Sequence, residues 1–276
     1  MEVAARPVRV AIAGTGGRMG QTLVAAILAQ HDIALAAALE LAGSPLLGRD
    51  AGSPLGQGAG VVVGSDVAAA LRDADVLIDF TRPVATVAHV HACAEAGVGA
   101  VIGTTGLSED DKKALAEAAR TIPLVYAPNM SVGVNVLLRL VALAAQRLGG
   151  DYDVEIVEMH HRHKVDAPSG TALQLGEAAA AALGRDLKTD GVFARDGVTG
   201  ERRPGAIGFA ALRGGDVIGD HTVIFAGPGE RIELAHKASS RTTFAHGALR
   251  AARFVAARRA AKAPGLYGMR DVLGLD

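Results

Sequence analysis

The chain has 276 residues, of which 50% are hydrophobic, 21% are charged and 3% are aromatic. Its 28 Lys and Arg nearly balance its 29 Asp and Glu, which gives a formal net charge of −1. The length predicts about two folded domains, and the charge balance and the scarcity of aromatic rings exclude a broad surface for binding nucleic acid.

The first half of the sequence alternates short apolar runs with helical patterns. Apolar runs at residues 8–13, 33–39, 61–63, 76–80, 99–102 and 124–126 predict buried strands. Segments 19–30, 66–72, 83–96 and 108–120 predict helices, the last with Ser108 as N-cap and Asp111 at a capping-box spacing. Strands that alternate with helices predict an α/β fold with a doubly wound, mostly parallel sheet covered on both faces.

The second half has a different pattern. Helices are predicted at residues 134–148, 171–183 and 242–261, and strands at 154–159, 207–213, 217–226 and 231–238. Gly-rich turns separate the last three strands, which predicts an antiparallel meander. This half is therefore predicted to be an α+β domain.

The location of the protein is predicted from what the sequence contains and lacks. Cys93 is the one cysteine, so no internal disulfide can form, and its Ala-rich surroundings predict a buried thiol. The start of the chain has no basic leader followed by a long apolar stretch and a cleavage site. Residues 132–148 are apolar but contain Asn135 and Arg139, which favours a buried helix over a membrane span. We expect a soluble cytoplasmic protein with no membrane or nucleic-acid partner.

A glycine-rich turn, GTGGRMG at residues 14–20, lies between the first predicted strand and the first helix. Glycines there let the backbone approach a pyrophosphate, and the helix N-terminus supplies free N–H groups. The βαβ context favours a dinucleotide site over a simple tight turn. Met19 holds the third glycine position of the usual pattern, and a spacing of Gly14, Gly17 and Gly20 fits as well.

Other residues after predicted strands are consistent with a dinucleotide. Glu40 ends the second strand, where a carboxylate accepts hydrogen bonds from an adenosine ribose, although it could also be a solvated charge. Leu41 offers no cation for a 2′-phosphate, which predicts a preference for NADH over NADPH unless Arg18 reaches that phosphate. Loops 103–106 and 127–130 also follow sheet strands, where ligands bind, although for each loop alone an ordinary connecting turn is the safer interpretation.

Residues 158–171, EMHHRHKVDAPSGT, have the densest concentration of ionisable groups. A metal site built from the three histidines is disfavoured, because consecutive side chains diverge. A solvated basic loop is the ordinary explanation of such a charge run. The third interpretation is an anion site in which Lys and Arg supply charge, the N–H groups of Gly170 and Thr171 bind a carboxylate, and a His moves a proton. Beside a dinucleotide domain, it predicts hydride transfer to a small polycarboxylate.

Several segments together resemble the bacterial dihydrodipicolinate reductase family, also called 4-hydroxy-tetrahydrodipicolinate reductases, nearly from end to end. They are GTGGRMG, GTTG, APNMSVGVN, EMHHRHKVDAPSGTAL, RRPGAIGFAALRGGDVIGDHTV and HKASSRTTFAHGA. The resemblance implies NAD(P)H-dependent reduction of a cyclic dicarboxylate, 4-hydroxy-tetrahydrodipicolinate, in the diaminopimelate route to lysine. It implies a Rossmann-type dinucleotide-binding domain at residues 1–130 and 241–276. A substrate-binding domain with a mixed sheet is implied at residues 131–240. The resemblance also implies that the chain forms a homotetramer through this domain.

The resemblance also implies roles for individual residues. For the cofactor these are Gly14, Thr15, Gly16, Gly17, Arg18 and Met19 at the pyrophosphate, Glu40 at the ribose, and Gly103, Thr104, Thr105, Ala127, Pro128, Asn129 and Met130 near the nicotinamide. For the substrate, His160 matches a proton donor or acceptor, Lys164 a proton donor, and His161, Gly170 and Thr171 binding contacts. Leu41 replaces the Arg of some members, which argues against NADPH, and no metal ligand is implied.

Two other functions compete with this interpretation. One is another two-domain NAD(P)-dependent dehydrogenase of aspartate-family metabolism, which the HHRHK and PSGT segments disfavour. The other is an NAD-binding regulatory module. The near-neutral charge and the lack of a basic recognition helix disfavour such a module.

Overall fold

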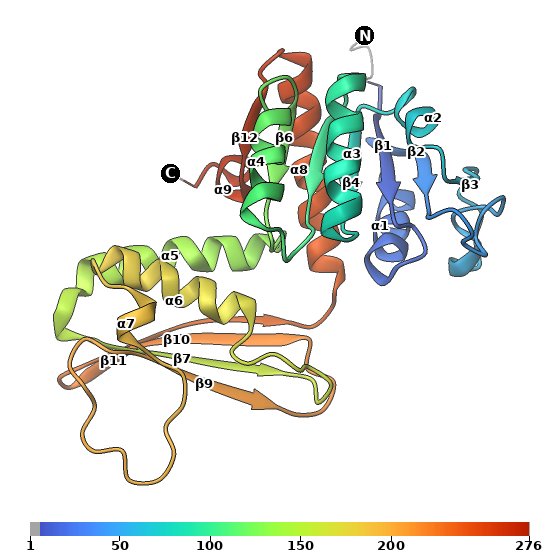
Figure 1. Cartoon of the computed structure of the whole chain (residues 1–276). Coiled ribbons are helices and arrows are strands. Elements are labelled where there is room, and N and C mark those ends of the chain that lie inside the picture. The colour runs from blue at the N-terminus through green and yellow to red at the C-terminus, as the bar shows by residue number, and fades with distance from the viewer. Residues whose placement is uncertain (1–5, 276) are drawn as a thin grey trace. The chain divides into compact units, whose positions relative to one another are not determined.

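The structure is a computed structural model, and it describes residues 6–275. The chain divides into two compact units (Figure 1). Unit 1 contains the residues up to Val132 and those from Thr242 onward, and unit 2 runs from Gly133 to Arg241. The last helices and strand of the chain therefore return to the unit formed by its first half.

Unit 1 is built on a seven-stranded sheet in which every pair of neighbouring strands is parallel. Its order is β12 (Gly265–Tyr267), β6 (Pro123–Tyr126), β5 (Gly99–Ile102), β4 (Val76–Asp79), β1 (Val8–Ala13), β2 (Ile33–Leu39) and β3 (Val63–Gly64). The predicted parallel sheet is confirmed, and β12 is a strand that the sequence patterns did not predict. The carboxyl ends of all these strands lie at one edge, which is where ligands bind in sheets of this kind.

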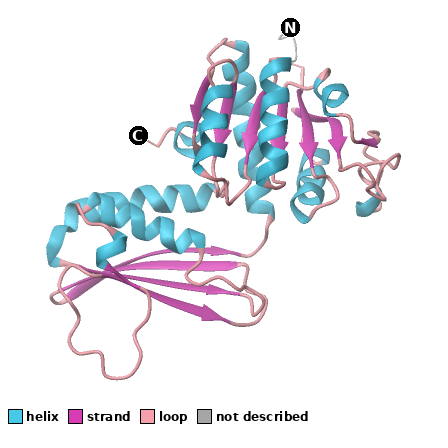
Figure 2. Ribbon diagram, in the orientation of Figure 1, coloured by secondary structure: helices cyan, strands magenta, loops and turns pink. Residues whose placement is uncertain are grey.

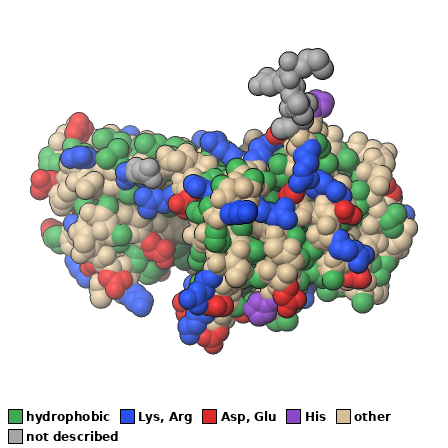
Figure 3. All heavy atoms as spheres, turned by 90° about the horizontal axis from the view of Figure 1, so that it is seen from above, with side chains coloured by type: hydrophobic (Ala, Val, Ile, Leu, Met, Phe, Trp, Pro, Cys, Tyr) green, Lys and Arg blue, Asp and Glu red, His purple; other side chains and the backbone are tan. Residues whose placement is uncertain are grey.

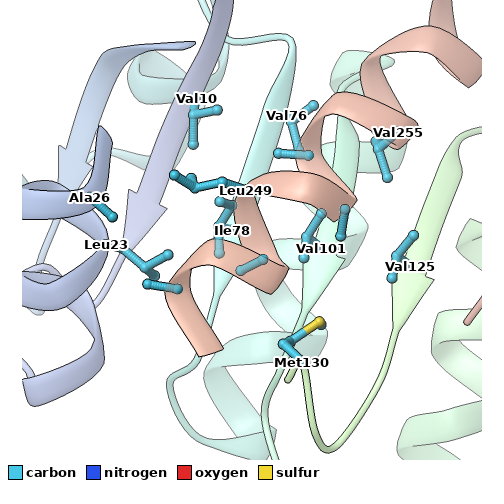
Figure 4. Close-up of a cluster of buried hydrophobic side chains, with 14 of the residues drawn as sticks. Val10, Leu23, Ala26, Val76, Ile78, Val101, Val125, Met130, Leu249 and Val255 are labelled. Atoms are coloured by element: carbon cyan, nitrogen blue, oxygen red, sulfur yellow. The ribbon is translucent and has the colours of Figure 1, made fainter. Parts of the chain in front are cut away.

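Helices cover both faces of this sheet because alternate side chains of its strands point to opposite sides. On one face, α1 (Arg18–Leu28) and α8 (Thr242–Ala260) pack on Val10 and Ile78 (Figure 4). On the other face, α2 (Val67–Leu71), α3 (Pro83–Ala96) and α4 (Glu109–Ala118) pack on strand residues such as Leu77. The predicted capping box is present at the start of α4, and a short helix, α9 (Met269–Leu273), follows β12.

Unit 2 contains a five-stranded mixed sheet with helices on one face (Figure 2). The order is β11 (Glu230–Ala238), β10 (Gly219–Gly227), β7 (Asp153–His160), β9 (Ile207–Arg213) and β8 (Gly191–Val192). Helices α5 (Val132–Leu148) and α6 (Gly170–Ala182) cover this sheet, and α7 (Leu187–Asp190) precedes β8. The predicted mixed sheet is confirmed.

The predicted antiparallel meander is wrong for one strand. Strand β9 pairs in parallel with β7, and β7 lies between β9 and β10. Residues 214–218 cross the end of β7, where Gly214 N donates to His160 O at 2.9 Å and His161 N donates to Val217 O at 2.7 Å. A Gly-rich connection of this length can form a hairpin or pass around a neighbouring strand, and the local pattern does not distinguish the two. The crossing places the connection directly against the end of β7.

Cys93 is fully buried, and burial raises the pKa of its thiol. The segment Val132–Asp151 is long and apolar enough to cross a membrane by length and composition alone. It buries only one face, with Val134 and Val141 in the core and Leu140 exposed, so the expected buried helix is half-buried. On the face seen in Figure 3, basic and acidic side chains are interspersed.

Candidate active site

The glycine-rich turn of unit 1 connects β1 to α1. Gly14 has a φ of 72°, a left-handed conformation that favours glycine, and its N–H donates to Leu39 O at 2.9 Å. Helix α1 begins after Gly17 without a side-chain cap. The turn therefore presents bare backbone beside a helix N-terminus, which is the arrangement that binds phosphate groups.

Close packing in this turn explains which glycines are required. A β-carbon on Gly20 would lie 2.1 Å from Gly14 O and 2.7 Å from Thr15 Cα, both backbone atoms. Met19 instead packs its side chain partly into the core. Of the two glycine spacings, the one with Gly14, Gly17 and Gly20 therefore matches the close approach of helix and turn.

Glu40 is attached to the same turn. Gly16 N donates to Glu40 Oε1 at 2.6 Å, and Leu41 N donates to Oε2 at 3.3 Å. A β-carbon on Gly16 would lie 2.9 Å from that Oε1. Glu40 is therefore a carboxylate held against the glycine turn, in contrast to the alternative of a solvated charge at a strand end.

A buried polar network lies at the carboxyl ends of β4 and β5. Asp79 is 0% exposed and accepts hydrogen bonds from Thr81 N at 2.7 Å and from Thr81 Oγ1 at 2.6 Å. His89 Nδ1 lies 2.8 Å from its other oxygen. Thr104 Oγ1 lies 2.7 Å from Thr86 Oγ1 and 3.4 Å from Asp79. This carboxylate ties the predicted 103–106 loop to the start of α3.

The side chains of loops 103–106 and 127–130 have different environments. Those of Thr104 and Met130 are buried within unit 1, so these residues can offer only backbone to a ligand. Thr105 and Pro128 are exposed. Asn129 Oδ1 accepts a hydrogen bond from Ser131 N at 2.9 Å, which shapes the end of the second loop.

In unit 2, strand β7 carries Glu158 and His160 on one face. Its alternating burial places both side chains on the buried side, beneath α6. Glu158 is 1% exposed and His160 is 9% exposed. His160 Nδ1 lies 2.6 Å from Glu158 Oε2, so the two form a buried pair at the end of the strand.

Glu158 joins three separate segments. Arg213, at the end of β9, donates to both of its carboxylate oxygens at 2.8 Å. Ser169 N, immediately before α6, donates to Oε1 at 3.1 Å. Burial alone raises the pKa of Glu158, but Arg213 and His160 outweigh it and hold that pKa below its usual value.

The N-terminus of α6 is fixed by a second histidine. Ser169 is the N-cap, and its Oγ accepts from Ala172 N at 3.1 Å and lies 2.8 Å from His221 Nε2. Burial lowers the pKa of His221 to about 4, and the nearby His160 adds to that effect. His221 is therefore neutral at physiological pH, and it packs edge-on against His160 with ring centroids 5.1 Å apart. Gly170 and Thr171 form the first turn of α6 that follows.

Lys164 lies in the loop between β7 and α6. Its Nζ donates to both carboxylate oxygens of Asp166 at 2.8 Å, and its side chain is 19% exposed. The lysine lowers the pKa of Asp166 by donating these bonds. The loop is closed by a hydrogen bond from Lys164 N to His161 O at 3.1 Å.

His161 lies within a cationic environment. Burial lowers its pKa, and the charges of Arg241, His163, His160 and Lys164 lower it further. These groups of unit 2 are thus close enough to act on one another electrostatically. Within residues 6–275, no three His, Cys, Asp or Glu side chains are arranged to hold a metal ion.

The sequence predicts roles for His160, His161 and Lys164, but not for the residues that hold them. It predicts only a strand at Arg213 and no role for His221 or Ser169. Glu158 lies in the segment 158–171. Residues two apart on a strand point to the same face, so this spacing could have indicated that Glu158 contacts His160. Asp79 at the end of a buried strand carried a similar signal in unit 1.

Comparisons with known proteins agree across both units. The family model "Dihydrodipicolinate reductase, N-terminus" matches residues 8–130, and "Dihydrodipicolinate reductase, C-terminus" matches residues 133–273. A 4-hydroxy-tetrahydrodipicolinate reductase of Thiobacillus denitrificans is 60% identical over 97% of this chain and 99% of its own. A 4-hydroxy-tetrahydrodipicolinate reductase of Cupriavidus necator is 59% identical over 96% of this chain and 99% of its own.

A solved structure supports the same assignment. The dipicolinate-bound dihydrodipicolinate reductase from Paenisporosarcina sp. TG-14 has a TM-score of 0.74 and 26% identity, covering 96% of this chain and 99% of that one. Both halves of the chain thus match one family over nearly their whole length. The chain belongs to the dihydrodipicolinate reductase family, and it catalyses the NAD(P)H-dependent reduction of 4-hydroxy-tetrahydrodipicolinate in diaminopimelate and lysine biosynthesis.

Proposed function

We propose that unit 1 holds the pyridine nucleotide, and that unit 2 holds the dicarboxylate and the groups that protonate it. The observation that carries this proposal is the cluster at the end of β7. There a buried His160–Glu158 pair, the Lys164 loop and the first turn of α6 belong to one hydrogen-bonded arrangement. The relative solved with bound dipicolinate supports a small dicarboxylate as the ligand.

The residues of unit 1 fit a dinucleotide. A pyrophosphate binds at an uncapped helix N-terminus, and α1 begins after Gly17 without a capping side chain. We assign Gly14–Met19 to the pyrophosphate, Glu40 to the adenosine ribose, and residues 103–105 and 127–130 to the nicotinamide side. When bound, the nicotinamide supplies a hydride.

In unit 2, charge and backbone donors suit a dianion. Lys164 supplies a positive charge, and the N–H groups at the start of α6 add the favourable end of a helix dipole. We assign one substrate carboxylate to Gly170 and Thr171, with His161 and Lys164 as further contacts. Lys164 would exchange its ion pair with Asp166 for one with the substrate.

Reduction leaves negative charge on the substrate ring, and a proton must neutralise it. His160 has Nδ1 engaged with Glu158, which leaves Nε2 as the nitrogen that can exchange a proton. Lys164, whose ammonium group forms an ion pair with Asp166, can donate a proton or stabilise the developing charge. We therefore assign protonation to His160 and Lys164.

This assignment is tested by NMR with the inhibitor-like dicarboxylate pyridine-2,6-dicarboxylate. Addition of the compound should shift the amide resonances of Gly170 and Thr171 and the ring resonances of His160 and His161. The amide of Lys188 on α7 serves as a reference in the same unit. Shifts confined to residues outside 158–171 would show that the dicarboxylate binds elsewhere.

We infer that NADH is preferred to NADPH, because Leu41 beside Glu40 is 75% exposed and uncharged. In a Leu41→Arg variant, the ratio of kcat/KM for NADPH to kcat/KM for NADH should rise about tenfold. The new guanidinium would donate a charge-assisted hydrogen bond to the 2′-phosphate, and such a bond contributes ~1.5–3 kcal/mol. Leu41→Gln, of similar reach without charge, is the control and should leave the ratio nearly unchanged. A wild-type enzyme that strongly prefers NADPH would contradict the inference.

We propose a cytoplasmic homotetramer that forms through unit 2, as the family resemblance implies. The supporting feature is β11, which lies at the edge of its sheet beside β10 among the described residues. Ile232 of β11 is exposed in the single chain. Analytical ultracentrifugation measures the assembly directly, and a monomer at micromolar concentration would refute it.

A further inference from the structure

We propose that Glu158, held by Arg213, is a positioning residue that fixes which nitrogen of His160 carries the proton. The proposal rests on the proposed role of His160 and extends it to two residues with no assigned role. Glu158 does not need to touch the substrate, because it acts through His160 and through the segments that surround it.

Arg213 determines the ionisation state of the Glu158 carboxylate. Arg213 donates to Glu158 Oε2 through one terminal nitrogen and to Oε1 through the other, both at 2.8 Å. This two-point contact is the strong geometry for a guanidinium and a carboxylate, and it keeps Glu158 ionised although it is buried. An ionised carboxylate can only accept hydrogen bonds.

The tautomer of His160 follows from that state. His160 Nδ1 lies 2.6 Å from Glu158 Oε2, so Nδ1 must carry the hydrogen. In the neutral ring, Nε2 is then the atom that can accept a proton, and in the charged ring it is the atom that can release one. Within residues 6–275, no hydrogen bond to Nε2 is present.

The space around Nε2 is consistent with this role. A β-carbon on Gly219, at the start of β10, would lie 3.0 Å from Nε2. Glycine at that position leaves the nitrogen uncrowded. Neutral His221 packs edge-on against the His160 ring and does not add a charge.

The ion pair of Glu158 and Arg213 also holds the start of α6 and the loop that carries Lys164. Ser169 N donates to Glu158 Oε1 at 3.1 Å, which fixes the residue that caps α6. Arg213 also donates to Asp166 O at 2.7 Å, which anchors the loop that carries Lys164. One buried Glu–Arg pair therefore sets the position of the histidine, the lysine loop and the helix turn together.

The direct test is the protonation pattern of His160 in the wild-type enzyme. Two-bond ¹H–¹⁵N spectra of ¹⁵N-histidine-labelled protein distinguish the two tautomers, and a His160→Gln variant assigns the signal. At mildly alkaline pH, the hydrogen is expected on Nδ1. A hydrogen on Nε2 in the wild-type protein would overturn the proposal without any need for a Glu158 variant.

The second test is kinetic. In Glu158→Gln, the amide cannot accept at both of its terminal atoms, so the tautomer is no longer fixed. We expect kcat to fall about 10²–10⁴-fold, as when a catalytic histidine loses the carboxylate that orients it. The KM for substrate should change less than about threefold, because the amide oxygen can still accept from Ser169 N and Arg213 keeps its bond to Asp166 O. Glu155→Gln is the matched control, because Glu155 lies on the same strand and pairs with Arg195 and Arg202. Its kcat should stay within about twofold of the wild-type value.

A double variant separates positioning from general stability. If Glu158 acts through His160, adding Glu158→Gln to His160→Gln should lower kcat by less than about threefold further. An undiminished effect in that background, or an unchanged kcat in Glu158→Gln alone, would overturn the proposal. A His160→Gln variant with wild-type kcat would instead remove the proposed role of His160, which is a separate and distinguishable result.

Discussion

Replacement of Lys164 by alanine is expected to lower kcat about 10²–10⁴-fold, the range for loss of a general acid. The ammonium group is held at 2.8 Å from both oxygens of Asp166, in a loop that closes through His161. Its removal takes away a charge from the predicted dicarboxylate site and the proposed proton donor to the reduced ring. The KM for the substrate should rise as well, because the same charge also stabilises the bound ground state.

Steady-state kinetics with freshly prepared substrate measures both parameters. Lys188→Ala is the control, since it removes an equal charge from an exposed position on α7 of the same unit. An unchanged kcat in Lys164→Ala with a raised KM would limit the lysine to binding. Turnover near the wild-type value for both parameters would exclude it from the site.

Local patterns in the sequence were sufficient to predict most strands and helices of unit 1. Each predicted strand there is a short apolar run that ends near a glycine or a polar residue, and burial on both faces leaves little else such a run can form. The capping box at Ser108 and Asp111 marked the start of α4 for the same local reason. The short strand β12 was missed because three residues give no periodicity.

The arrangement of unit 2 depends on contacts between distant segments, which local patterns do not contain. The position of β7 between β9 and β10 is set by pairing across the whole sheet. The partner of Glu158 is Arg213, 55 residues further along the chain. The sequence could therefore indicate residues 158–171 as a candidate site, but the identity of the groups that hold His160 required the fold.

The net charge of the chain also hides how its charges are arranged locally. A formal net charge of −1 excluded a polyanion surface. The structure adds that cationic groups of unit 2 are concentrated around His161, where Arg241, His163 and Lys164 all lower its pKa. A small dianion is the class of ligand that such a local cluster suits.

A second large effect is expected where helix α8 touches the backbone of Met130. In Gly247→Ala, the new methyl carbon would lie 1.7 Å from Met130 O and 2.8 Å from its carbonyl carbon. These are backbone atoms of a buried residue, so the clash cannot be relieved by a side-chain rotation. Figure 4 shows Met130 beside this helix, near the labelled core residues. The helix must therefore move away from the end of the 127–130 loop.

The sign of this change is the opposite of what the sequence alone predicts. Glycine inside a helix normally costs about 0.8–1 kcal/mol relative to alanine, so the variant would be expected to gain stability. Overpacking against buried backbone costs about 1–3 kcal/mol or more. We expect a net loss of unfolding free energy, measured by urea denaturation, and a raised KM for NADH because residues 127–130 are assigned to the nicotinamide side.

The control is Gly58→Ala in an exposed loop of the same unit, where a β-carbon meets no atom within 4 Å. That variant should change the unfolding free energy by less than about 0.5 kcal/mol and leave the KM for NADH unchanged. If Gly247→Ala is as stable as the wild-type protein or more so, α8 does not pack on Met130 as closely as described. If it loses stability but keeps its KM for NADH, the packing is correct and the assignment of residues 127–130 to the cofactor is wrong.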